Sequence, residues 1–275
     1  MRALLYIILA ALLGSPASAQ VNLGFPKEPQ RNVQIPGPGL VTGSSLFAPA
    51  AAGPRPAVVL SHTCGGLRTH VFQWAAKLVD AGYVALVIDH FGPRKVTSNC
   101  WPKYSFSYNA VAQDAVAGMK HLRTLPFVDG KRIAHMGFSM GAMAGLRSAS
   151  PSFRRAHLGG ERFAAIVSFY PFCAYSGLEG QENFYSDTDA PLLLLLGEKD
   201  DEAAAAPCVQ QARALAARGA PVKWKLFPDT THAFDGPSLT RQSGGKTFTY
   251  RHNPKAVEEA WRESREFLAR HMPGK

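Results

Sequence analysis

The chain has 275 residues, of which 46% are apolar, a composition that argues against disorder and suffices for a sizeable core without a structural metal. The 25 glycines and 20 prolines indicate many turns. The formal charge is +10, but the basic residues are scattered, which favours a solvated basic surface over a nucleic-acid site.

The first residues have the pattern of a secretory signal peptide. Arg2 supplies a positive charge, residues 3–13 form an unbroken apolar run, and residues 17–19 read Ala-Ser-Ala, an A-x-A cleavage site. This apolar run is too short to span a hydrocarbon core of about 30 Å. We therefore predict a signal peptide at 1–19, cut after Ala19. Residues 20–275 are expected to form a single exported domain, periplasmic or extracellular, with no stable membrane insertion.

From residue 57 onward, short apolar runs alternate with stretches of helical periodicity. This alternation predicts an α/β fold with a mostly parallel central sheet and helices on both faces. Ligands on such sheets bind beyond the carboxyl ends of the strands. The predicted strands cover 57–61, 83–89, 132–138, 163–170, 191–196 and 222–227, with an edge strand at 39–47. The predicted helices cover 71–81, 109–125, 140–150, 202–218 and 255–271.

Residues 137–141 read Gly-Phe-Ser-Met-Gly, a G-x-S-x-G motif between a predicted strand and a predicted helix. This context is the one that a nucleophile elbow requires, and the α/β-hydrolase fold is its best-known host. The turn exposes the serine hydroxyl at a helix N-terminus, where backbone N–H groups favour developing negative charge. We predict that Ser139 is a catalytic nucleophile.

A serine hydroxyl needs a base to become a good nucleophile, and the chain has nine histidines. His232 follows the last predicted strand and precedes the final helix, so it can reach back over the sheet to Ser139. The order Ser, acid, His of this fold also favours it. Other histidines are less favoured because they precede the serine (His62, His90) or lie within predicted elements (His121, His135), while His157 and His252 in loops stay open.

The base must be oriented by a buried carboxylate, which we expect after the strand at 191–196. That segment ends in Gly-Glu-Lys-Asp-Asp. Asp200 is the preferred acid, with Asp201 as the main alternative and Glu198 as the third.

The tetrahedral intermediate of acyl transfer needs two N–H donors. One is expected from Met140, the residue after the nucleophile. Residues 62–66 read His-Thr-Cys-Gly-Gly, which resembles the glycine-rich oxyanion loop of lipases and esterases. The second donor is therefore expected to be the amide of Cys64, with Gly65 as the alternative.

Together, His-Thr-Cys-Gly-Gly-Leu at 62–67, Gly-Phe-Ser-Met-Gly at 137–141, Gly-Glu-Lys-Asp-Asp at 197–201 and His-Ala-Phe at 232–234 resemble the dienelactone hydrolase family. The resemblance implies an α/β-hydrolase core of about eight strands, no cofactor, and hydrolysis of an ester or lactone. The enzymes that name the family use a cysteine nucleophile, whereas this chain has Ser139, and Thr63 stands where glycine is usual. These departures favour a general carboxylic-ester hydrolase.

The chain has four cysteines, an even number that favours disulfides in an exported protein, and no C-x-x-C pair of the kind that binds metal. Cys64 and Cys100 follow two successive strands at the same end of the sheet, and Cys173 and Cys208 follow the next such pair. We predict the bridges Cys64–Cys100 and Cys173–Cys208, one of three possible connectivities.

Three long loops, 90–105, 171–190 and 233–253, are expected to leave the catalytic edge and to shape the substrate site. They carry aromatic and basic residues, and Arg94 is one candidate for binding a substrate carboxylate. The other interpretation is that these charges are solvated. The sequence also leaves open a serine peptidase or amidase on the same fold, or a non-catalytic binding protein with a hydrolase scaffold. It does not indicate the oligomeric state.

Overall fold

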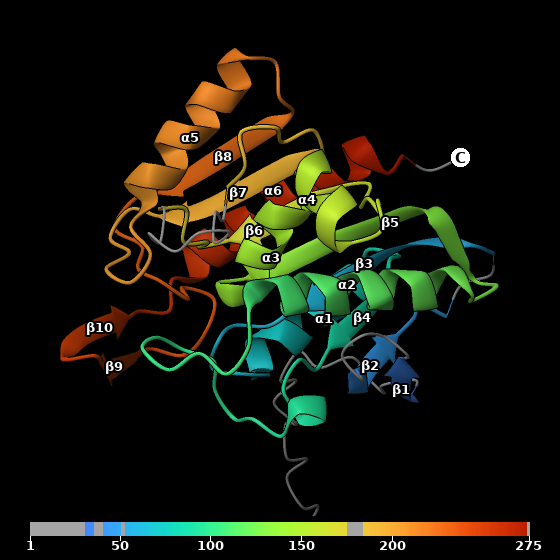
Figure 1. The fold of residues 1–275 in the computed structure, drawn as a ribbon, viewed down its shortest axis with the longest axis horizontal. Helices are drawn as coiled ribbons and strands as arrows, with labels where there is room; N and C mark the ends of the chain where they lie inside the picture. The colour runs from blue at the N-terminus through green and yellow to red at the C-terminus, as the bar shows by residue number, and fades with distance from the viewer. Residues whose placement is uncertain (1–30, 36–40, 51–52, 175–183, 274–275) are drawn as a thin grey trace, which may run out of the picture.

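The fold was obtained as a computed structural model, which describes residues 31–35, 41–50, 53–174 and 184–273 (Figure 1). The predicted signal peptide at residues 1–19 lies outside the described residues.

The core is an eight-stranded sheet in the order β1-β2-β4-β3-β5-β6-β7-β8. The first two strands pair antiparallel, β2 also pairs antiparallel with β4, and the strands from β4 to β8 are mutually parallel. The predicted, mostly parallel α/β sheet is therefore confirmed. The strands are β1 (Arg31–Ile35), β2 (Val41–Phe47), β3 (Arg55–Ser61), β4 (Val84–Ile88), β5 (Val128–Phe138), β6 (Ile166–Phe169), β7 (Leu192–Gly197) and β8 (Val222–Phe227).

Helices cover both faces of this sheet, because most of its parallel strands are apolar on both sides. Successive residues of β7 alternate between two core clusters: Leu192 and Leu194 pack with the α2, α3 and α5 side, and Leu193 and Leu195 with the α1 and α6 side. The helices are α1 (Thr69–Asp80), the 3-10 turn η1 (Gly92–Arg94), α2 (Tyr108–Arg123), α3 (Met140–Ser148), α4 (Pro151–His157), α5 (Ala205–Ala217) and α6 (Pro254–His271).

The predicted helix at 140–150 is wrong at its end, because α3 stops at Ser148 and a second helix, α4, follows. Pro151 disfavours a helical conformation at the residue before it. Ser150 instead caps α4, since its side chain accepts a hydrogen bond from the amide of Phe153.

The segment 233–253, expected to be a loop, contains a two-stranded antiparallel hairpin of β9 (Leu239–Ser243) and β10 (Lys246–Tyr250). Figure 1 shows this hairpin beside the carboxyl end of the sheet rather than within it. The hairpin matters for function, because its last residue, Tyr250, reaches the candidate site. Among the described residues, no helix combines the length and apolar character that a membrane span requires.

Candidate active site

Ser139 occupies a sharp turn between β5 and α3, with φ 49° and ψ −107°. Positive φ is rare for a residue with a side chain and marks local strain. The flanking glycines permit the turn, because a Cβ on Gly137 would lie 2.2 Å from the carbonyl oxygen of Gly141, and a Cβ on Gly141 equally close to that of Ser61. The G-x-S-x-G spacing thus lets strand and helix meet closely enough to present the hydroxyl at the turn.

The structure brings the three predicted side chains together although they are far apart in the chain. His232 Nε2 lies 3.1 Å from Ser139 Oγ, and His232 Nδ1 lies 2.7 Å from Asp200 Oδ2. The other oxygen of Asp200 accepts hydrogen bonds from the amides of Glu202 (3.0 Å) and Ala203 (2.7 Å). These bonds fix the carboxylate so that one oxygen faces the imidazole. The same arrangement of hydroxyl, imidazole and carboxylate occurs in serine catalytic triads.

The two alternative acids point elsewhere. Asp201 Oδ2 accepts a hydrogen bond from the amide of Thr249 on β10 (3.1 Å), and Glu198 Oε2 accepts one from the amide of Asp229 (3.1 Å). Asp201 thus anchors the hairpin and Glu198 supports the loop before His232. Of the three candidates, Asp200 is the one in contact with the imidazole.

His232 is buried, and its surroundings decide its protonation. Burial lowers the pKa of its imidazole, but the charge and hydrogen bond of Asp200, with smaller contributions from Glu202 and Asp235, raise the pKa overall above the ordinary 6.5. The ring of Tyr170 packs against it with 4.7 Å between centroids, and the Tyr170 hydroxyl donates to Asp235 Oδ1 (2.7 Å). Asp235 also accepts from the Trp74 indole (2.8 Å). Tyr170, itself held by Asp235, therefore helps to fix the position of the His232 ring.

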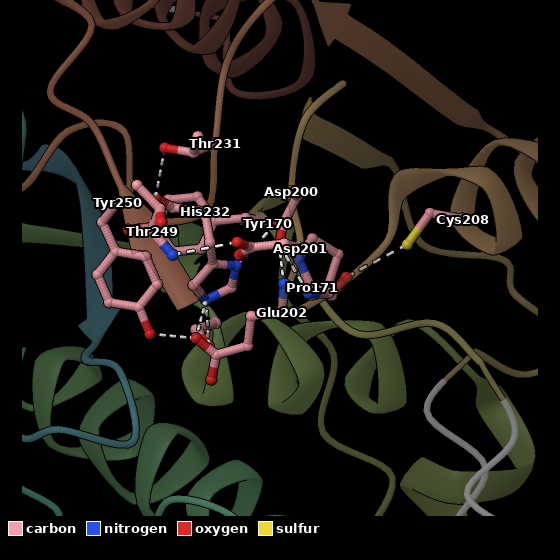
Figure 2. Close-up of polar contacts among 12 residues, drawn as sticks. Tyr170, Pro171, Asp200, Asp201, Glu202, Cys208, Thr231, His232, Thr249 and Tyr250 are labelled. Carbon is pink, nitrogen blue, oxygen red and sulfur yellow. Dashed lines mark hydrogen bonds and ion pairs between the residues drawn. The ribbon is translucent and has the colours of Figure 1, made fainter. Parts of the chain in front are cut away.

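A second carboxylate, not predicted from the sequence, lies near the other ring nitrogen of His232. Glu202 Oε2 lies 4.0 Å from His232 Nε2, and the Glu202 carboxylate contacts the hydroxyl of Tyr250 (Figure 2). The same carboxylate also contacts the guanidinium of Arg241. The available signal was its position two residues after Asp200. Its partners lie on the hairpin, in a segment that the sequence predicts to be a loop.

The loop at 62–66 docks against the elbow. The amide of Gly141 donates to the carbonyl of His62 (3.1 Å), and the amide of Asn99 donates to the carbonyl of Cys64 (2.8 Å). Asn99 Nδ2 also lies 3.5 Å from Met140 Sδ. The two amides expected to face an oxyanion, those of Cys64 and Met140, therefore belong to segments that are tied together. Met140 is the first residue of α3, where the amide has no partner within the helix.

Both predicted disulfides are present. Cys64–Cys100 joins the segments after β3 and β4, and Cys173–Cys208 joins the segment after β6 to α5. The first bridge ties the loop that docks on the elbow to the segment after β4. It therefore fixes Cys64 from the side-chain end, while Asn99 holds it at its carbonyl.

The structure places Arg94, the candidate for a substrate carboxylate, against a buried carboxylate of the protein itself. Its guanidinium forms two hydrogen bonds with the buried Asp114 carboxylate, at 2.7 and 2.9 Å, and a third with the carbonyl of His90. It also stacks over the ring of Phe106. A buried carboxylate requires such a partner, so we assign Arg94 to neutralising Asp114. The sequence could not reveal this pairing, because Asp114 lies on a helix twenty residues away.

Several of the remaining histidines contact other parts of the protein. His62 accepts a hydrogen bond from the amide of His90, and His135 contacts the hydroxyl of Ser61 at 2.9 Å. Burial lowers the pKa of His135 to about 3, so this side chain stays neutral. The loop candidates His157 and His252 pack on Phe153 and contact the carbonyl of Gly236, respectively.

Comparison with known proteins adds a family to this geometry. A model of the dienelactone hydrolase family matches residues 43–272. The chain belongs to the dienelactone hydrolase family. Membership supports a carboxylic-ester hydrolase and confirms the resemblance seen in the sequence.

One relative and two solved structures resemble this dienelactone hydrolase family protein over nearly their whole length. A Bradyrhizobium protein named "probable 2-oxo-3-(5-oxofuran-2-ylidene)propanoate lactonase" is 24% identical over 84% of this chain and 90% of its own. A dienelactone hydrolase-like promiscuous phosphotriesterase from metagenomic libraries superposes with a TM-score of 0.64 at 21% identity, over 87% and 97% of the two chains. A thermophilic esterase of Thermogutta terrifontis gives 0.64 at 17% identity, over 90% and 92%. The two structures show a shared α/β-hydrolase fold.

Proposed function

We propose that this protein is an exported serine hydrolase that cleaves carboxylic esters or lactones through an acyl-enzyme on Ser139. The observation that carries the proposal is the arrangement around His232. Its Nε2 lies within hydrogen-bond distance of the Ser139 hydroxyl, while its Nδ1 is bound by Asp200. A base held between a nucleophile and a buried carboxylate is the arrangement that activates serine for acyl transfer.

In the first half-reaction, Ser139 Oγ attacks the ester carbonyl carbon while His232 Nε2 takes the hydroxyl proton. Asp200 stabilises the resulting imidazolium and keeps its Nδ1–H directed at the carboxylate. The tetrahedral intermediate collapses when His232 returns the proton to the leaving alcohol oxygen. In a lactone the same bond breaks, but the alcohol stays attached to the acyl group. Water then hydrolyses the acyl-enzyme by the reverse sequence of proton transfers.

The amides of Met140 and Cys64 are the proposed oxyanion donors. Helix α3 begins at Met140, so its amide and the helix dipole both favour the developing negative charge. Cys64 is preferred over Gly65 because the Gly65 amide is directed at the Thr63 hydroxyl, 3.3 Å away. Thr63, which departs from the usual glycine, thereby leaves Cys64 as the second donor.

Family membership and the name of the Bradyrhizobium relative support esters and lactones as substrates, ahead of peptides or amides. The filled triad positions weigh against a non-catalytic binding protein. Export after removal of residues 1–19 is supported by two disulfides, which persist in oxidising compartments. A panel of p-nitrophenyl esters, lactones and anilides would separate esterase, lactonase and amidase preference.

The decisive experiment replaces the nucleophile. Ser139→Ala is expected to lower kcat on p-nitrophenyl esters by about 10⁴- to 10⁶-fold, because acylation is no longer possible. It should also abolish labelling by a fluorophosphonate probe. Ser186→Ala, at an exposed serine, is the matched control and should keep both activity and labelling. Esterase activity that survives in Ser139→Ala would overturn the proposal.

A further inference from the structure

Glu202 stands on the reactive side of the imidazole, in the segment between Asp200 and the start of α5. Its Oε2 lies 4.0 Å from Nε2 of His232, the nitrogen that faces Ser139, whereas Asp200 binds the opposite nitrogen. Its side chain is 18% exposed, so it is shielded without being sealed from solvent. The proposed proton transfers need only Asp200 and His232, and this leaves Glu202 without an assigned role.

The carboxylate of Glu202 is held rigidly by the hairpin. Tyr250 at the end of β10 donates its hydroxyl to Oε2 (Figure 2). Arg241 on β9 donates to Oε1. The Arg241 Nε also donates to the Tyr250 oxygen at 2.9 Å, which closes a triangle. Burial and the bond to Glu202 raise the pKa of Tyr250, so the phenol keeps its proton and remains a donor. The position of Oε2 is therefore fixed relative to His232.

This placement leaves Oε2 able to accept one more hydrogen bond. A carboxylate oxygen offers two lone-pair directions, and Tyr250 takes one of them. Two acceptors 4.0 Å apart can both lie at hydrogen-bond distance from a single water molecule. A water that donates one O–H to neutral His232 Nε2 and the other to Glu202 Oε2 keeps its lone pairs free for attack.

We propose that Glu202 is a further catalytic residue, which binds and orients the water of the deacylation step together with His232. The proposal rests on the proposed acyl-enzyme on Ser139. The water oxygen forms a bond to the acyl carbon as His232 Nε2 takes one of its protons, while the second proton stays hydrogen-bonded to Glu202. On collapse, the bond between the acyl carbon and Ser139 Oγ breaks, Oγ recovers the proton from Nε2, and the carboxylic acid leaves.

Glu202→Gln tests this role with little change of shape. Arg241 can only donate, so the amide oxygen of the new side chain is expected to face Arg241, as Oε1 does now. The amide NH₂ then takes the place of Oε2 and offers the water a donor where an acceptor is needed. Acylation, which uses the serine hydroxyl and no water, should be affected far less.

The experiment is rapid-mixing kinetics of p-nitrophenyl butyrate hydrolysis by the full enzyme, combined with intact-protein mass spectrometry. In Glu202→Gln we expect the deacylation rate to fall about 10- to 100-fold, the usual effect of losing a hydrogen bond to a charged group. The first p-nitrophenol equivalent should appear at nearly the wild-type rate. A burst and a butyryl adduct on Ser139 should therefore accumulate. Tyr250→Phe, which frees Oε2 from its anchor, should slow the same step by less.

Controls separate this inference from the proposed function. Glu263→Gln on α6 is the matched control, because Glu263 is also paired with an arginine (Arg262, 3.0 Å) but lies outside the site. Its burst and steady-state rates should equal those of the wild type. Equal slowing of acylation and deacylation in Glu202→Gln, or slowing of neither, would overturn the role of Glu202. A Ser139→Ala variant that still releases p-nitrophenol, with no butyryl group on residue 139 in any variant, would instead overturn the acyl-enzyme itself.

Discussion

His232 is surrounded by acidic and phenolic groups: Asp200, Glu202, Asp235, Tyr170 and Tyr250. Burial lowers its pKa, and the carboxylates, led by Asp200, raise the pKa above 6.5. The neutral imidazole is the base, so activity should rise with pH as His232 loses its proton. We expect kcat/KM on a neutral ester to increase through a midpoint above pH 6.5, measured between pH 5 and 9.

The pH profile of kcat/KM also tests which carboxylate raises the pKa of His232. In Asp200→Asn, burial continues to lower the pKa while the main raising charge is gone, so the midpoint should move to lower pH. The rate itself should fall by about 10³- to 10⁴-fold, as when the orienting acid of a triad is lost. Asp201→Asn, whose carboxylate binds the hairpin, should leave the midpoint in place. A midpoint that Asp200→Asn does not move would contradict this account.

At single residues, the sequence predicted best where a motif dictates backbone geometry. Ser139 and its two glycines could be placed because the spacing itself requires the strand–turn–helix junction. Asp200 could be preferred but not separated from Asp201, since which carboxylate faces His232 depends on the two amides that bind Asp200. The pairing of Arg94 with Asp114 could not be predicted, because Asp114 is buried on another element.

Among the elements, the hairpin β9–β10 positions Tyr250 and Arg241 and contacts the loop after β4. Its turn has φ +54° at Gly244 and +74° at Gly245, the signature of a type I′ turn. A Cβ on Gly244 would lie 1.9 Å from the ring of Trp101, whereas a Cβ on Gly245 would meet nothing within 4 Å. The two glycines are therefore a matched pair, alike in backbone and different in contact.

We expect Gly244→Ala to lower kcat/KM by about three- to tenfold, because the hairpin and Trp101 must separate, and small displacements of positioning groups slow catalysis strongly. Gly245→Ala should keep kcat/KM, although both variants pay roughly 1–2 kcal/mol of backbone strain in thermal unfolding. Equal kcat/KM in the two variants would show that the contact with Trp101 does not position the site.

The parallel strands were predictable and the hairpin was not, for one physical reason. Strands such as β7 are buried on both faces and read as continuous apolar runs. Half of the residues in the hairpin strands are exposed and only Phe248 is buried, so no apolar pattern marks them. The Gly-Gly pair at its turn was the available signal.

In the molecule as a whole, two disulfides tie neighbouring segments at the carboxyl edge of the sheet. They close loops of nearly equal length, with sequence separations of 36 and 35 residues. Because the loss of unfolded-chain entropy depends on loop length, each should stabilise the fold by a similar amount, about 3–4 kcal/mol. Loss of either bridge should therefore lower stability by a similar amount. Any difference in turnover between the two variants must then come from the segments that each bridge holds.

Cys64–Cys100 holds the loop with the proposed oxyanion amide, whereas Cys173–Cys208 holds α5 to the segment after β6. Replacing each pair by serines should lower the free energy of unfolding to a similar extent in denaturant titrations. Turnover at 25 °C, where both variants remain folded, should fall markedly only without the first bridge, since a misplaced oxyanion donor costs about 10²- to 10³-fold in kcat. Equal turnover in the two variants would mean that Asn99 and Gly141 alone keep the Cys64 amide in place.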